Sequence, residues 1–75
     1  MSHTVQTCVE FADRITRLYG IPIKVQKDPG GLVYIKIEGS EQGYLNSPWM
    51  GDAYLMGIFD LAAFLKPAKR EGDLP

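Results

Sequence analysis

The segment that most constrains the fold is residues 49–65, because on a helix it is apolar around almost its whole circumference. Its only charged residues are Asp52 and Asp60. A helix of this kind is normally buried on several sides. The chain has 75 residues, and a chain of that size buries only about 60% of the surface that its unfolded form exposes. Either this helix lies deep in a compact sandwich, or a partner covers part of it.

Two local signals compete for the start of this helix. Ser47 with Pro48 offers a cap residue and a proline in the first turn. Gly51 with Asp52 offers a later cap. We expect a first turn at Pro48 and continuous helix from Asp52.

The end of the helix also marks the end of the predicted domain. Lys66 complements the helix dipole and Pro67 stops the helix. Residues 68–75 are polar and contain glycine and proline, so we expect them to form a mobile tail. A single domain is therefore predicted over residues 1–67.

A second helix is predicted near the start of the chain. In residues 4–19, apolar side chains recur at three- and four-residue spacing, and charged side chains fill the opposite face. Thr4 is a suitable cap residue for its first turn. Gly20, followed closely by Pro22, ends it. The pattern is that of an amphipathic helix with one buried face.

Between the helices the hydrophobic period changes to two. Residues 21–26 and 32–38 alternate apolar and polar side chains, and the turn residues 27–31 separate them. A second turn precedes the short segment 44–46, which can add a third strand. The sequence predicts a small α+β domain of order α-β-β-(β)-α, with two helices packed on an antiparallel sheet of two or three strands.

Composition limits the kind of partner and the setting. Eight Lys plus Arg residues oppose nine Asp plus Glu residues, for a formal net charge of −1. Nucleic-acid and membrane-surface binders usually carry a stronger charge bias. The longest apolar stretch, residues 53–65, is shorter than the roughly 20 residues that span a bilayer. Cys8 is the only cysteine, which excludes an internal disulfide and favours a reducing, cytoplasmic setting.

We expect neither catalysis nor metal binding. His3 is the only histidine, and Cys8 falls on the apolar stripe of its helix, where a buried and inert thiol is expected. One histidine and one cysteine are too few for a zinc site. The carboxylates are scattered, and Asp60 is expected on a solvated edge of its helix. We therefore predict no enzyme activity, no cofactor and no small-molecule substrate.

A nucleic-acid-binding surface is the alternative reading of the hairpin. Lys24, Lys27, Tyr34 and Lys36 are able to share its outer face, and such basic and aromatic mixtures occur in single-strand binders. The element order also resembles that of the double-stranded RNA-binding domain. Residues 47–52, however, contain no basic side chain where such domains clamp phosphates. A solvated sheet face requires polar residues in any case.

The stronger candidate is a protein-binding surface on helix 48–65. Aromatic residues and methionine are enriched at interfaces, and each large side chain that a partner buries contributes on the order of 1.5–3 kcal/mol. The predicted contact residues are Trp49, Met50, Tyr54, Met56, Leu61 and Phe64.

The function that follows is a small intracellular protein-binding module, homodimeric or bound to a partner through this helix. Small regulators and inhibitors encoded by bacteria or their phages, anti-CRISPR-type proteins among them, are of this kind. The comparison rests on size and on the missing catalytic set, because no motif in the sequence supports it.

Overall fold

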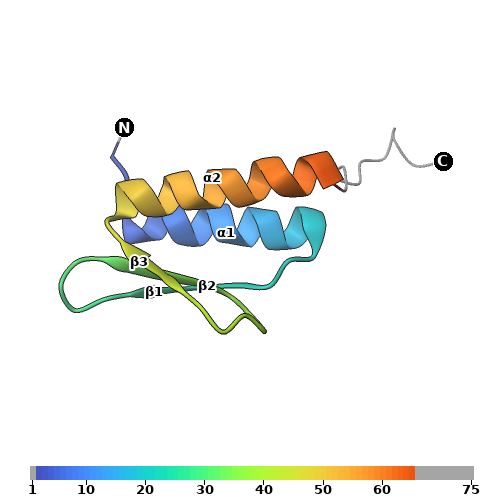
Figure 1. The fold of residues 1–75 in the computed structure, drawn as a ribbon. Coiled ribbons are helices and arrows are strands. Elements are labelled where there is room, and N and C mark those ends of the chain that lie inside the picture. Colours follow the sequence, from blue (N-terminus) through green and yellow to red (C-terminus); the bar gives the residue numbers. More distant parts are fainter. Residues whose placement is uncertain (1, 66–75) are drawn as a thin grey trace.

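The computed structural model describes residues 2–65, which form two helices and three strands (Figure 1). In chain order these are α1 (Val5–Tyr19), β1 (Ile23–Lys27), β2 (Val33–Ile37), β3 (Tyr44–Asn46) and α2 (Pro48–Leu65). The predicted α+β class and element order are confirmed, and the segment 44–46 does form the third strand. The predicted helix end at Lys66 and Pro67 and the predicted tail 68–75 lie outside the described residues.

The strands form one antiparallel sheet in the order β1-β2-β3, and both helices lie on the same face of it (Figure 1). α1 packs over β1, whereas α2 packs over β2 and β3 and beside α1. In the register of the hairpin, Val25 lies opposite Ile35 and Gln26 opposite Tyr34. Because side chains alternate across a strand, Val25 and Ile35 face the helices and Gln26 and Tyr34 face outward.

The ends of α1 are fixed by the residues that the sequence singled out. The Thr4 hydroxyl accepts a hydrogen bond from the Thr7 backbone N–H, and the Thr7 hydroxyl accepts one from the Thr4 N–H. This reciprocal pair satisfies two of the N–H groups that a helix start leaves open. At the other end Gly20 has φ +70°, a left-handed conformation that glycine adopts at little cost.

The core is small and draws on three elements. Its fully buried side chains come from α1, β2 and α2: Cys8, Ala12, Ile15, Val33, Ile35 and Leu55. A ring of half-buried apolar residues surrounds them, including the aromatic contacts of Phe59 with Phe11 and Tyr19. Each element therefore contributes one apolar face to a single core.

Gly51 sets how closely α2 approaches the rest of the core. A Cβ atom at this position would lie 2.7 Å from Val33 Cγ1 and 3.1 Å from Cys8 Sγ. Any larger residue would push α2 away from β2 and α1. Gly51 is thus a packing residue inside the helix, although the sequence offered it as part of a helix start.

The start of α2 decides between the two predicted start signals. The Ser47 hydroxyl accepts a hydrogen bond from the Met50 N–H, and the Ser47 carbonyl accepts one from the Gly51 N–H. The helix therefore begins at Pro48, as expected, and the later cap at Asp52 is not used. The physical reason is that Asp52 uses its side chain for contacts with α1 rather than for capping its own helix.

Candidate functional site

The outward face of α2 carries the largest exposed apolar side chains of the described residues. Five of them are at least half exposed: Trp49 (59%), Met56 (50%), Leu61 (59%), Phe64 (83%) and Leu65 (68%). The buried side of the same helix consists of Gly51, Leu55 and Ala62. The core thus uses one side of α2 and leaves the opposite side, which we call the α2 face, in solvent.

Four of the six residues predicted to contact a partner lie on the α2 face. The other two, Met50 and Tyr54, are half-buried. The Tyr54 ring stacks on Tyr44 of β3, with centroids 4.3 Å apart and planes 4° from parallel. Tyr54 therefore fixes α2 to the sheet. Leu65 was missed as a contact residue, although it belonged to the same apolar run that predicted the others.

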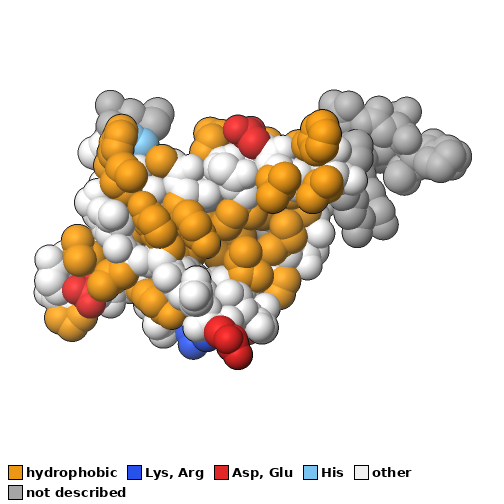
Figure 2. All heavy atoms as spheres, in the orientation of Figure 1, with side chains coloured by type: hydrophobic (Ala, Val, Ile, Leu, Met, Phe, Trp, Pro, Cys, Tyr) orange, Lys and Arg blue, Asp and Glu red, His pale blue; other side chains and the backbone are white. Residues whose placement is uncertain are grey.

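The α2 face is apolar with a weak acidic character. Asp60, the one charged residue on this face, is exposed as expected. Residues 37–65 contain no Lys or Arg and carry Glu38, Glu41, Asp52 and Asp60. Figure 2 shows this side of the molecule, where hydrophobic side chains cover much of α2 and the adjoining strands and few charged groups are visible.

The α2 face is as large as the largest apolar patch that a typical monomer exposes. Large aromatic side chains cover about 150–250 Å² each, so five large side chains at these exposures present on the order of 500 Å². That equals the largest apolar patch of a typical monomer, and such patches are often functional. Two such surfaces in contact reach the lower limit of about 1,000 Å² for a specific interface.

A pocket of about 410 Å³ opens at the N-terminal end of the α2 face. Trp49, Ala53 and Met56 of α2 form one wall, and Phe11 of α1 forms another. Polar groups lie at its edge, where His3 packs edge-on against Trp49 with ring centroids 6.4 Å apart. The α2 face is therefore not flat, because it ends in an apolar hollow large enough for a side chain.

Asp52 connects this pocket to α1. One of its carboxylate oxygens lies 2.6 Å from His3 Nδ1 and accepts a 2.8 Å hydrogen bond from the Thr7 hydroxyl. Burial by itself would raise the pKa of this carboxyl. Hydrogen bonds from His3 and Thr7, together with the neighbouring Cys8 thiol and the charge of protonated His3, hold the pKa below its usual value. These contacts of Asp52 join His3 and the first turn of α1 to α2.

Cys8 is not available as a nucleophile. Cys8 is fully buried, and burial together with the nearby Asp52 raises the pKa of its thiol to about 12. A thiol with that pKa is protonated and unreactive near neutral pH. Among residues 2–65, no group of three or more His, Cys, Asp or Glu side chains is placed to hold a metal ion.

The outer face of the sheet is the alternative site. Lys24 lies opposite Lys36, and Tyr34 lies on the same face opposite Leu45. Lys27 lies opposite the buried Val33, so strand alternation directs it toward the helix side, away from the other three predicted residues. The Tyr34 ring packs against Gly43, where a Cβ would overlap it. Two lysines and one partly covered tyrosine are a small surface for nucleic acid.

The chain matches no protein-family model, no curated protein and no solved structure. In the part of the chain that the structure describes, neither helix is both long enough and apolar enough to cross a membrane.

Proposed function

We propose that this protein acts by binding another protein through the α2 face, and that it performs no catalysis itself. The observation that carries the proposal is the row of large apolar side chains from Trp49 to Leu65 that the core leaves in solvent. If a partner buries three of them, the transfer free energy is about 5–9 kcal/mol before the cost of association. That range is sufficient for a specific complex.

The chemistry of the α2 face defines the partner. The partner must offer apolar side chains along the length of α2. One projecting apolar side chain of the partner fits the pocket beside Trp49 and Met56. The acidic residues around the helix, with Asp60 on the face itself, favour a partner with a basic or neutral polar rim. A regulator or inhibitor of the small bacterial or phage type would act in this way. Cys8, a buried free thiol, suits a reducing, cytoplasmic setting.

The test compares capture of proteins by the wild type and by variants of the α2 face. Leu61→Asp and Phe64→Asp each place a charge on the α2 face, and should lose the captured protein because an unpaired charge would be buried. Arg14→Asp on the exposed side of α1 is the matched control and should keep it. Circular dichroism checks that all variants fold.

A captured protein counts as the partner only if its purified form binds the wild type and fails to bind both α2 variants. Retention of the same proteins by Leu61→Asp and Phe64→Asp would reject the α2 face as the binding surface.

The sheet face is the second candidate, as a nucleic-acid surface built on Lys24, Tyr34 and Lys36. Its support is the register that places these three side chains together. A salt titration with single- and double-stranded oligonucleotides tests it, since binding carried by two lysines should weaken as salt rises. Absence of binding at low salt removes this candidate.

A further inference from the structure

The free edge of the sheet at β1 is separate from the α2 face and has its own unmet bonding capacity. At the two ends of β1, Glu38 N–H donates to the Pro22 carbonyl and Asp28 N–H donates to the Leu32 carbonyl. Hydrogen-bonded pairs alternate along an antiparallel ladder, so the even-numbered residues of β1 direct their backbone groups toward β2. The N–H and C=O groups of Ile23, Val25 and Lys27 therefore point away from β2, toward the free edge of the sheet; we call these the outward groups of β1.

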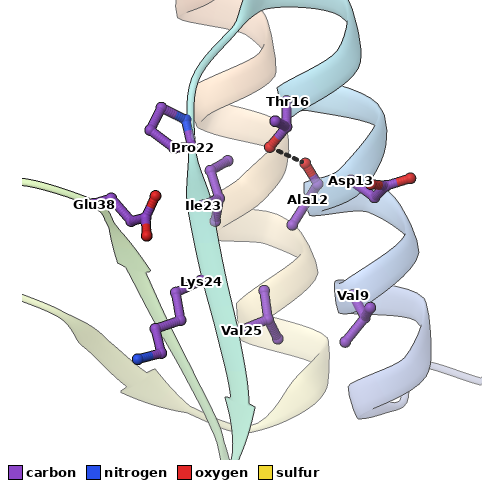
Figure 3. Close-up of a pocket in the computed structure, with 9 residues that line it drawn as sticks. All are labelled: Val9, Ala12, Asp13, Thr16, Pro22, Ile23, Lys24, Val25 and Glu38. Atoms are coloured by element: carbon purple, nitrogen blue, oxygen red, sulfur yellow. Dashed lines mark hydrogen bonds between the residues drawn. The ribbon is translucent and has the colours of Figure 1, made fainter.

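No residue within 2–65 hydrogen-bonds to these outward backbone groups. Beside them a groove of about 460 Å³ runs between β1 and α1 (Figure 3). Figure 3 places Val9 of α1 beside Val25 at one end of the groove, and Asp13 and Glu38 toward the Pro22 end. Val9 is the exposed large apolar residue of α1, at 39% exposure. The edge thus combines open backbone bonds with an apolar contact beside Val25.

We infer that β1 pairs antiparallel with β1 of a second copy of this chain, joining two sheets into one of six strands. The two-fold axis passes through Val25, so Val25 lies opposite Val25 of the second copy and Ile23 lies opposite its Lys27. In this register every outward N–H and C=O of β1 has a partner. The Val9 side chains of the two copies then meet across the axis, above the two Val25 residues.

Charge and backbone hydrogen bonding favour this register over its neighbours. In it, Lys24 lies opposite Gln26 of the second copy, so no two like charges face each other. A shift of two residues in one direction places Lys24 opposite Lys24 of the second copy. The opposite shift places Lys24 opposite Asp28, but it sets Ile23 against Pro29, which has no N–H to donate. The register through Val25 is therefore the one that pairs every outward N–H and C=O group of β1 without opposing like charges.

This dimer is independent of the proposed function. α2 lies over β2 and β3, away from β1, so pairing at β1 leaves both α2 faces open. A dimer of this kind presents two binding faces to a partner, and a partner with repeated sites would bind it more tightly than it binds one copy.

The test is amide hydrogen exchange measured as a function of protein concentration, together with sedimentation. Dimerisation through β1 should protect the amides of Ile23, Val25 and Lys27 as the concentration rises, with no comparable change in α2. Val9→Asp should raise the dimer dissociation constant about a hundredfold or more, because two carboxylates would meet in a desolvated contact. Val9 is exposed in the single chain, so the variant is expected to fold.

Leu61→Asp is the matched control, since it makes the same apolar-to-acidic change on the α2 face and should leave the dimer intact. Three outcomes overturn the inference: a strictly monomeric protein at high micromolar concentration, protection of the β1 amides that does not change with concentration, or a dimer that Leu61→Asp dissociates and Val9→Asp does not. The last outcome would move self-association to the α2 face.

Discussion

The two helices lie side by side on the same sheet face, yet they meet solvent in opposite ways. α1 has 15 residues and α2 has 18, and each buries a narrow apolar side in one shared core. Away from the core, α1 is polar and charged, with Asp13 and Arg17 forming an ion pair. α2 is apolar there as well, from Trp49 to Leu65. Folding accounts for the apolar residues of α1 apart from the exposed Val9, whereas α2 leaves five large apolar side chains at least half exposed.

This difference between the solvent-facing sides of α1 and α2 distinguishes apolar residues that stabilise the fold from apolar residues that are free to bind a partner. A sequence under selection for folding and solubility alone would carry polar residues on the outside of α2, as it does on α1. The exposed side chains of α2 add little to the core, and they increase the risk of association. We propose binding to another protein as the physical reason for them.

The largest effect should come from comparing the two sides of α2 with the same substitution. Leu55 is fully buried and Leu61 is 59% exposed. Leu55→Ala should lower the free energy of unfolding by about 2–5 kcal/mol, because it leaves a cavity in the core. Leu61→Ala should change it by no more than about 0.5 kcal/mol. Urea denaturation followed by circular dichroism measures both free energies of unfolding. Equal losses in the two variants would show that both sides of α2 contribute equally to the core.

The two glycines of α2 sharpen the same comparison. Gly51→Ala should destabilise the protein by about 1–3 kcal/mol, since its Cβ would overlap Val33. At Gly57, on the outward side, a Cβ would meet no atom within 4 Å. Gly57→Ala should therefore stabilise the helix by about 0.4–1 kcal/mol. Thermal denaturation measures the stability of both variants. A stabilising effect of Gly51→Ala would show that α2 does not pack this closely on Val33.

A smaller effect is expected where α1 and α2 are joined by Asp52. Asp52→Asn should cost about 1–2 kcal/mol at neutral pH, because it weakens the hydrogen bonds from His3 and Thr7. The pKa of Asp52 is lowered from 3.8 in the folded protein. Its stabilising contribution is thus complete above about pH 4–5 and is lost as the pH falls through the folded pKa.

Unfolding titrations of wild type and Asp52→Asn from pH 7 to pH 2 check this prediction. The two stabilities should converge in acid. A constant difference across the whole range would mean that the carboxylate charge has no part in joining the helices.

Local signals in the sequence were sufficient for the helix ends at Thr4 and Gly20 and for the alternating strands. They also showed the excess of apolar residues in helix 48–65, but left open whether the fold or a partner covers them. Contacts between distant residues were not accessible in this way. His3 and Asp52 are 49 residues apart, and only the packing of α2 beside α1 brings them together.

The same limit explains which contact residues were assigned correctly to the surface. A helical projection places Leu61 and Phe64 on one flank and Leu55 on another face, but it does not tell which of them the sheet covers. Tyr54 was predicted to bind a partner and instead stacks on Tyr44, because the position of β3 decides where that ring can lie. Gly51 was interpreted from the sequence as part of a later helix start, and only its close approach to Val33 reveals its packing role.

Site-specific photo-cross-linking tests most directly whether a protein contacts the α2 face. A photo-reactive amino acid is incorporated at position 64, the most exposed large apolar side chain of residues 2–65, or at position 14 on the polar side of α1, in cells that make the protein. We expect one dominant protein adduct from position 64 that is missing from position 14 and is lost when Leu61→Asp is added. Adducts that are the same from both positions would contradict binding through the α2 face.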